Sequence, residues 1–287
     1  MVTFSSSSEE RIGVYTDSGV IDLKSGCEQC FPSDKKRIFT DMQTFLSTGE
    51  DGMKAAKEIV SSVLEGGQED KKSCLAQRYE LKAPVPKPEK ILCPAVNYLE
   101  HGREGGVSPP SEPYFFGKFA NSIIGPDEPV IIPSVSKMPD YEVELAAIIG
   151  KRGKHIQEEN AYDFIAGYTI LNDISLRDLQ GWPKPNPTYG SHWLMGKCAD
   201  TACPMGPWIV TGDELESAYP LKIRLSVNGI TRQDSDTSLQ IFKLPRLISY
   251  ASQVMTLKPG DIVSTGTPSG VGRTTNTYLK EGDLIKA

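Results

Sequence analysis

Two glutamates with one residue between them, Glu142 and Glu144, open the apolar run YEVELAAIIG at residues 141–150. Alternate side chains of a β-strand point to the same face, so the two carboxylates would lie side by side. Like charges at that distance repel unless a cation lies between them or one carboxylate is protonated. Carboxylate oxygens are ligands that suit Mg²⁺, Mn²⁺ and Ca²⁺. The spacing therefore indicates a metal site, and a solvated strand face with ordinary surface glutamates is the alternative.

A third acid, Asp173, follows the apolar, strand-like stretch GYTIL. Strand ends hold side chains rigidly and are therefore common places for site residues. The next segment, residues 175–180, has the pattern of a short helical turn that places Arg177 and Gln180 on one face. A helix cap with an ion pair is the alternative for Asp178. The grouping of Asp173, Arg177 and Gln180 around one turn nevertheless favours a site.

Three further segments could form the walls of such a site. In NYLEHGREGG, His101 and Glu104 lie three apart on one helical turn among glycines. This pattern fits a lid over a substrate, and a solvated ion pair is the alternative. The segment GKCADT contains Lys197. The small residues of STGTPSGVG, residues 264–272, let backbone amides approach a ligand, but without the Gly-Lys-Ser/Thr ending of a P-loop they do not indicate nucleotide binding.

Short strands separated by glycine, proline and asparagine turns must position these residues, because that pattern fills the chain after residue 91. The pair Asn228-Gly229 between apolar runs predicts a tight hairpin. Helical spacing of apolar residues returns at residues 244–257. The strands predicted in this part cover residues 130–133, 143–150, 168–172, 208–210, 221–227 and 261–265.

The beginning of the chain has a different pattern. Its predicted strands cover residues 1–4 and 11–23, with a turn at 17–19. Apolar residues at helical spacing between residues 55 and 64 predict a helix that ends at Gly66-Gly67. Prolines at alternate positions predict a stiff, extended segment at residues 81–90, where we expect a domain boundary. The sequence predicts a β-rich α+β fold, with a small N-terminal α/β domain at residues 1–85 and a catalytic domain at 86–287.

The overall composition excludes several classes of protein. The chain has 287 residues, 38% of them hydrophobic and 24% charged, with a net charge of -6. These values are typical of a globular protein with a sizeable core. An acidic chain without a long basic run is a poor candidate for nucleic-acid binding. No apolar stretch approaches the ~20 residues of a membrane span. Cys27 and Cys30 form a lone C-x-x-C, so we expect reduced thiols in a reducing compartment.

Several motifs, in the same order along the chain, resemble the fumarylacetoacetate hydrolase superfamily. They are NYLEHGRE, FGKFANSIIGP, YEVELAAIIGKRGKHI, GYTILNDISLRDLQ, GKCADTACPMGP, VNG and LKPGDIVSTGTPSGVG. The resemblance covers residues 91–287, is weaker before them, and is greatest to a mitochondrial branch whose members are assigned as oxaloacetate tautomerases. It implies a mixed β-roll, a Mg²⁺ or Mn²⁺ cofactor, and a homodimer in the mitochondrial matrix. The visible N-terminus has no transit peptide, so the cytoplasm is the alternative. The family's last strands would follow Ala287, so we expect a truncated C-terminus.

The same resemblance implies roles for individual residues. The metal ligands it implies are Glu142, Glu144 and Asp173. The catalytic residues it implies are His101 and Glu104, as a lid dyad, and Lys197. The substrate-binding residues it implies are Arg177, Gln180, Thr267 and Lys118.

The expected chemistry follows from the metal and a 2-oxo acid. Such an acid offers a carboxylate and a keto oxygen to one cation, which would stabilise the enolate formed when a C3 proton leaves. Lys197, or His101 oriented by Glu104, would carry the proton. The activity expected from the resemblance is keto–enol tautomerisation of oxaloacetate. Oxaloacetate decarboxylation and acylpyruvate hydrolysis use the same enolate and are the alternatives, as is an inactive metal-binding scaffold.

Overall fold

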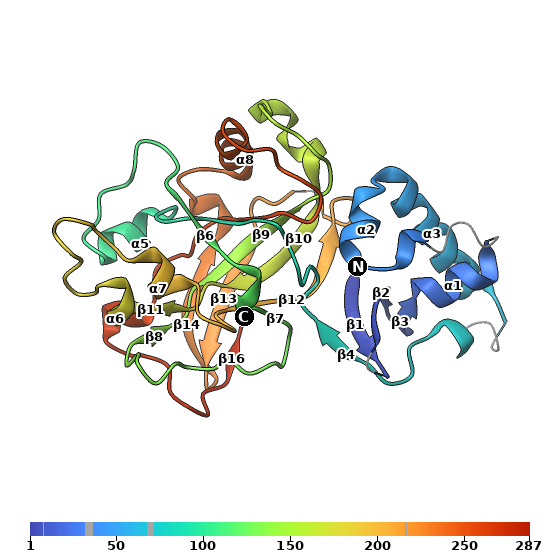
Figure 1. Ribbon diagram of the computed structural model, residues 1–287, viewed down its shortest axis with the longest axis horizontal. Coiled ribbons are helices and arrows are strands. Elements are labelled where there is room, and N and C mark those ends of the chain that lie inside the picture. The colour runs from blue at the N-terminus through green and yellow to red at the C-terminus, as the bar shows by residue number, and fades with distance from the viewer. Residues whose placement is uncertain (8, 32–36, 68–71, 216) are drawn as a thin grey trace.

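The computed structural model describes residues 1–7, 9–31, 37–67, 72–215 and 217–287. Its strands form a four-stranded sheet, a seven-stranded sheet, and smaller sheets of three and two strands. Figure 1 shows the four-stranded sheet with α1, α2 and α3 on one side of the molecule and the remaining sheets together on the other. No helix among the described residues is both long and apolar enough to span a membrane.

The four-stranded sheet is antiparallel, in the order β3-β2-β1-β4. The predicted turn joins β2 to β3, where Gly19 has a positive φ of 115° that suits glycine. Asp22 then caps α1 by accepting from the N–H groups of Lys24 and Ser25. The predicted helix is confirmed as α3, and Gly66 caps its end. The elements are β1 (Val2–Ser6), β2 (Glu9–Thr16), β3 (Gly19–Asp22), α1 (Leu23–Cys30), α2 (Met42–Ser47), α3 (Glu50–Glu65) and β4 (Glu80–Lys82).

The seven-stranded sheet is mixed, in the order β6-β5-β15-β9-β10-β12-β7. Its middle strand β9 is buried at every residue and pairs antiparallel with β15 on one edge and β10 on the other. Burial on both faces explains why this strand is almost entirely apolar after Glu144. The strands are β5 (Ile91–Pro94), β6 (Phe115–Lys118), β7 (Ile123–Ile124), β9 (Val143–Ile149), β10 (Ile165–Asn172), β12 (Cys203–Thr211) and β15 (Ile262–Ser264).

Two small sheets and several short helices surround this central sheet. The predicted hairpin at Asn228-Gly229 is confirmed, because both residues have positive φ and join β13 to β14. The strands of the small sheets are β8 (Pro139–Asp140), β11 (Ser175–Leu176), β13 (Lys222–Val227), β14 (Ile230–Asp236) and β16 (Ile285–Lys286). The helices are α5 (Leu99–Glu104), α6 (Arg177–Gln180), α7 (Trp193–Lys197), α8 (Leu244–Ser252) and α9 (Gly272–Thr275), with 3₁₀ turns η2 (Ala120–Ser122), η3 (Glu158–Phe164) and η4 (Thr237–Leu239).

Two predictions about these elements need correction. The strand predicted at residues 130–133 is absent, because Ile131 is 63% exposed and its N–H donates to the Thr201 hydroxyl instead of a neighbouring strand. The flanking prolines have no N–H to give to a ladder. The helix predicted at residues 244–257 ends at Ser252, and Val254 beyond it is exposed.

The two large sheets contact each other directly. The Ile209 N–H on β12 donates to the Met1 carbonyl (2.8 Å), and Tyr15 stacks on Trp208 with ring centroids 4.7 Å apart. The segment between β4 and β5 joins the sheets covalently and contains the boundary predicted at residues 85 and 86. That boundary remains a prediction.

Candidate active site

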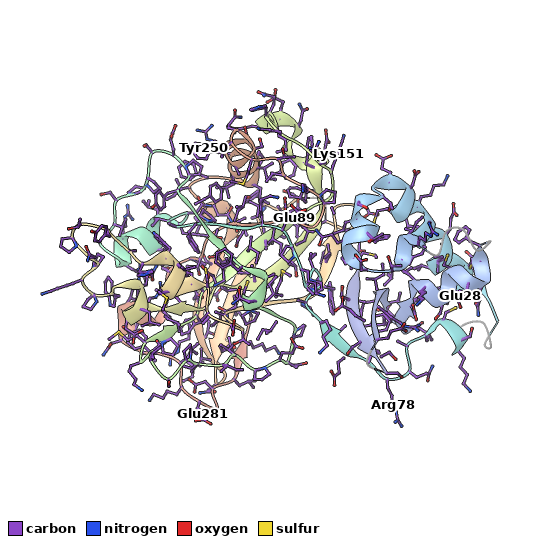
Figure 2. The ribbon with its side chains drawn as sticks, in the orientation of Figure 1. Glu28, Arg78, Glu89, Lys151, Tyr250 and Glu281 are labelled. Atoms are coloured by element: carbon purple, nitrogen blue, oxygen red, sulfur yellow. The ribbon has the colours of Figure 1, made fainter. Side chains whose placement is uncertain are left out.

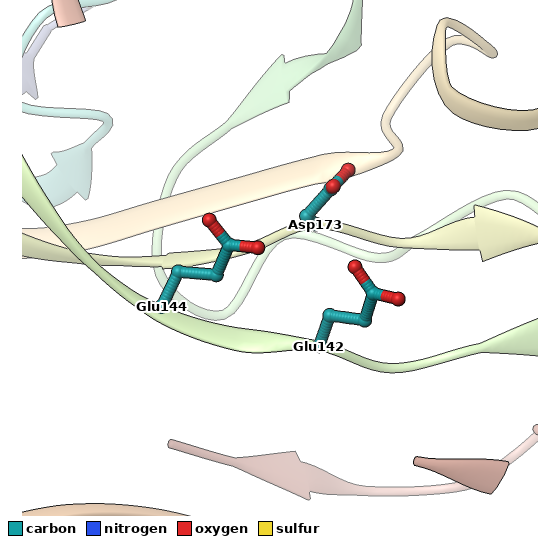
Figure 3. A group of neighbouring side chains, drawn as sticks. All are labelled: Glu142, Glu144 and Asp173. Carbon is teal, nitrogen blue, oxygen red and sulfur yellow. The ribbon is translucent and has the colours of Figure 1, made fainter. Parts of the chain in front are cut away.

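The pairing of β9 with β10 brings three acids together. Glu142 directly precedes β9, and its N–H donates to the Asn172 side-chain oxygen (2.9 Å) at the end of β10. The N–H of Asp173 donates back to the Glu142 carbonyl (2.8 Å). Figure 3 shows Glu142 and Glu144 projecting from one strand toward Asp173 on the neighbouring segment. Each of these three buried carboxylates, here called the carboxylate triad, offers one oxygen within 4.8 Å of the others.

Glu144 is the member of the triad without a cationic partner among the described residues. Its carboxylate accepts hydrogen bonds from the Ser264 hydroxyl and from the Gly266 N–H (3.0 Å). Burial raises the pKa of this carboxyl well above its usual range, and the charges of Asp173 and Glu142 raise it further. A divalent cation held by the three carboxylates would relieve this repulsion, and an all-oxygen donor set suits such a cation. The residues therefore fit a hard divalent metal.

Two lysines neutralise the other two acids of the triad. Lys197, the last residue of α7, places its Nζ 2.7 Å from Glu142 Oε2 and 2.6 Å from Asp173 Oδ2. Lys118, at the end of β6, places its Nζ 2.8 Å from Asp173 Oδ1. Burial opposes the charge of Lys118, but Asp173 more than offsets it and raises the pKa of this lysine. Burial likewise opposes the charge of Glu142, yet Lys197 and Arg177 hold its pKa well below the usual range.

Arg177 links the triad to an acid that sequence reasoning missed. Its Nε donates to Asp140 Oδ2 (2.8 Å), its Nη2 pairs with Glu142, and its Nη1 donates to Gln180 Oε1 (3.2 Å). The shared face of Arg177 and Gln180 is therefore confirmed. Asp140 also accepts from the Gly272 N–H (2.6 Å). Its signal in the sequence was an acid two residues before Glu142, which alternation along the strand would place on the same side.

Thr267 is engaged with the backbone of β9. Its hydroxyl donates to the Val143 carbonyl (3.0 Å) and accepts from Gln233 Nε2 (2.8 Å). The side-chain oxygen of Gln233 in turn accepts from the Val143 N–H (3.0 Å). Gln233 is a buried residue of β14 that sequence reasoning also missed, and no motif near it marks it as part of the site.

The two residues of the expected lid dyad are not hydrogen-bonded to each other among the described residues. His101 on α5 is 4% exposed, and its Nδ1 has no hydrogen-bond partner there. Burial lowers the pKa of His101 to about 3, so the imidazole is neutral. The Glu104 carboxylate instead accepts from the Gly270 N–H (3.1 Å), and burial raises the pKa of this carboxyl. The expectation that Glu104 orients His101 therefore needs correction, because Glu104 is turned toward the loop after β15.

Four buried carboxylates thus face three buried cations around the triad. The structure brings together most of the residues predicted for the site, which come from segments more than 150 residues apart in the chain. The carboxylates are those of Asp140, Glu142, Glu144 and Asp173, and the cations are Lys118, Arg177 and Lys197.

A family comparison agrees with this arrangement. The family described as "Fumarylacetoacetate (FAA) hydrolase C-terminal" matches residues 90–287, which include every residue of the site. The chain belongs to this family. The superfamily resemblance and the β-rich α+β fold expected from the sequence are thereby confirmed.

Individual relatives extend the likeness over most of the chain. A Xenopus laevis protein named "Oxaloacetate tautomerase fahd2, mitochondrial" is 43% identical over 247 residues, which are 85% of this chain and 74% of the relative. A Homo sapiens protein named "Oxaloacetate tautomerase FAHD2A, mitochondrial" is 41% identical over 85% of this chain and 75% of the relative.

Solved structures share the fold of the whole chain. A structure described as a putative HpcE protein from Mycobacterium smegmatis has a TM-score of 0.79 and 32% identity, covering 99% of this chain and 94% of its own. A maleylpyruvate hydrolase from Sphingobium sp. SYK-6, solved in complex with manganese (II) ion and pyruvate, has a TM-score of 0.74 and 30% identity, covering 99% of this chain and 93% of its own.

Proposed function

We propose that this chain is a metal-dependent oxaloacetate tautomerase. The observation that carries the proposal is the buried carboxylate triad, whose Glu144 has no cationic partner among the described residues. The names of the 41–43% identical relatives support the choice of reaction. The Sphingobium structure with manganese and pyruvate supports a divalent metal and a 2-oxo acid. We propose Mg²⁺ or Mn²⁺ on Glu142, Glu144 and Asp173.

When bound, such a cation would polarise the keto oxygen of a 2-oxo acid as a Lewis acid. Lys197 adds a positive charge beside the same acids. Two of its N–H donors face Glu142 and Asp173, and the third can stabilise the oxygen on which the enolate charge develops. Neutral His101 has an unpartnered Nδ1 and is our candidate for moving the C3 proton. Glu104 holds α5 to the loop at Gly270, so we propose that it positions the lid.

The remaining predicted residues fall into two groups: those with a polar atom free to contact substrate, and those whose polar atoms are already bonded within the protein. The side-chain oxygen of Gln180 accepts a hydrogen bond from Arg177, and its amide nitrogen donates to no described atom. We therefore propose Gln180 as a substrate contact. Arg177 holds Glu142 in place through their ion pair. Lys118 and Thr267 are fully engaged, and we propose that they support Asp173 and β9.

The location and assembly are also proposals. We propose a mitochondrial enzyme, because both tautomerase relatives are named mitochondrial. We propose a homodimer on the family resemblance. Light scattering after size-exclusion chromatography would measure the assembly, and a monomeric mass would contradict it.

Ultraviolet absorbance of the oxaloacetate enol, followed with and without Mg²⁺, tests the activity. Catalysed enol–keto exchange at constant total oxaloacetate is the expected result. Faster formation of pyruvate would instead indicate a decarboxylase, cleavage of acetylpyruvate would indicate a hydrolase, and unchanged rates would indicate a scaffold. Glu144→Ala should abolish the exchange, whereas the surface variant Asp234→Asn should leave it intact.

A further inference from the structure

Arg273 is a cation beside the triad that none of the roles above uses. Its backbone N–H donates to Asp140 Oδ2 (3.0 Å), the oxygen that also accepts from Arg177 Nε (2.8 Å). Arg177 is paired in turn with Glu142. The base of the Arg273 side chain is therefore tied to the triad through Asp140 and Arg177.

The guanidinium of Arg273 lies between two segments that cover the site. Its Cζ is 5.3 Å from the centroid of the Trp182 ring, and the N–H of Trp182 donates to the Arg177 carbonyl (2.8 Å). On the other side, a Cβ added to Gly105 would lie only 2.4 Å from Arg273 Nη2. Gly105 caps α5, the helix that carries His101. Arg273 therefore bridges the candidate lid and the turn after α6.

This guanidinium has no acceptor in the part of the chain that the structure describes. Its Nε is buried without a hydrogen-bond partner, and Glu104 on the adjacent lid is turned to Gly270. Burial lowers the pKa of Arg273, and the positive charge of Arg177 lowers it further, together by more than the negative charges of nearby carboxylates raise it. Buried donors left unpaired are costly, and an arginine fork matches a carboxylate through two parallel hydrogen bonds.

We propose that Arg273 binds the distal carboxylate of a dicarboxylic 2-oxo acid and thereby selects it over 2-oxo acids that lack this group. The proposal rests on the proposed function, in which the 2-oxo acid end of the substrate lies at the triad. The three cations at the triad are each paired with a buried carboxylate, so they are not free to take the far end of the substrate. Arg273 lies further out, next to α5, and its guanidinium donates to no acceptor among the described residues.

The kinetic test compares oxaloacetate with its 4-methyl ester, which keeps the 2-oxo acid end but loses the distal charge. Arg273→Gln should lower kcat/KM for oxaloacetate by about 10- to 100-fold, the range of a hydrogen bond to a charged group, mainly through KM. For the ester the change should stay under about 3-fold. Arg273→Lys should recover part of the loss, because it keeps the charge and not the fork.

Arg246→Gln is the matched control, because Arg246 also lies over an aromatic ring, Tyr250, but on α8. Tyr250 lies at the top of Figure 2, away from α5 and α6 in the same orientation of Figure 1. This variant should leave kcat/KM unchanged for both substrates. If Arg273→Gln lowered kcat/KM equally for oxaloacetate and for the ester, the role of Arg273 would be merely structural. If kcat/KM for oxaloacetate did not fall, Arg273 would not contact the distal carboxylate. Either result overturns the proposal.

A binding measurement separates this inference from the proposed function. Calorimetry in Mg²⁺ compares malate with lactate, which share a 2-hydroxy acid end and differ by the distal carboxylate. The wild-type protein should bind malate about 10-fold or more tightly, and Arg273→Gln should remove that preference. A wild-type protein with this preference but no tautomerase activity would overturn the proposed function alone. A wild-type protein without the preference would overturn the role of Arg273.

Discussion

Replacing Asp140 tests whether the residues behind the triad hold it in place. The Asp140 carboxylate is fully buried and accepts from Arg177 Nε (2.8 Å) and from the N–H groups of Gly272 (2.6 Å) and Arg273 (3.0 Å). Asparagine offers one oxygen and one NH₂ group in the same volume, so at least one of these donors would face another donor. Arg177 would also lose one of its two carboxylate partners.

The expected cost follows from this burial. Removing one partner of a buried ion pair typically costs about 3–5 kcal/mol, because it leaves an uncompensated charge. We therefore expect Asp140→Asn to lower the free energy of unfolding by about 3–5 kcal/mol. The same change in an exposed pair should cost less than about 1 kcal/mol. Asp234 and Arg224 form such a pair, 2.8 Å apart on the surface, so Asp234→Asn is the matched control.

Urea unfolding followed by tryptophan fluorescence measures both variants. The reasoning predicts a clear drop in midpoint for Asp140→Asn and almost none for Asp234→Asn. If the two variants lost the same free energy to within about 1 kcal/mol, Asp140 would not be holding a buried charge, and its place behind the triad would be refuted.

Three further predictions concern the site itself. Burial raises the pKa of the Glu144 carboxyl well above its usual range, so the folded protein binds more protons than the unfolded chain and loses stability as the pH rises. In EDTA, Glu144→Gln should therefore be more stable than wild type between pH 5 and 8, as measured by thermal unfolding. The same variant should not be stabilised by Mg²⁺. Unchanged metal-free stability would contradict this. Lys197→Met should cut tautomerisation at least ~10²-fold while calorimetry still detects Mg²⁺ binding, and near-normal kinetics would place the residue outside the site. His101→Asn should lower kcat by roughly 10²–10⁴-fold yet leave metal-dependent activity, and complete loss would point to a hydrolase-like use of water.

The triad could be predicted because its geometry is local to two strands. The two-residue period of a strand places Glu142 and Glu144 on one face, and Asp173 follows the end of another strand. What alternation cannot show is which strands become neighbours. The register of Leu171 against Glu144 brings Asp173 to the triad, and that register became visible only in the fold. The family motifs supplied the same grouping independently.

The residues that the sequence did not reveal, or revealed only in part, contact residues that are distant in the chain. Gln233 reaches Thr267 and Val143 from a different sheet, and no local pattern distinguishes it from a surface glutamine of a hairpin. Lys118 and Thr267 were predicted as substrate contacts from motifs, but a motif does not show whether a side chain is already satisfied by its own protein. Arg273 could not be predicted for the opposite reason. Its distinguishing feature is that its Nε lacks a hydrogen-bond partner, and only the folded structure shows this.

The placement of β9 between β10 and β15 has a consequence for synthesis of the chain. The acids of the triad have all been translated by residue 173, but β15, which closes the other edge of β9 and brings Ser264 and Gly266 to Glu144, emerges about 90 residues later. Until then a nascent chain presents an open, apolar strand edge, the kind of surface that pairs with other chains. Ribosome-bound chains stalled near residue 240 should therefore be captured by chaperones and digested by protease, and chains that extend past β15 should resist both.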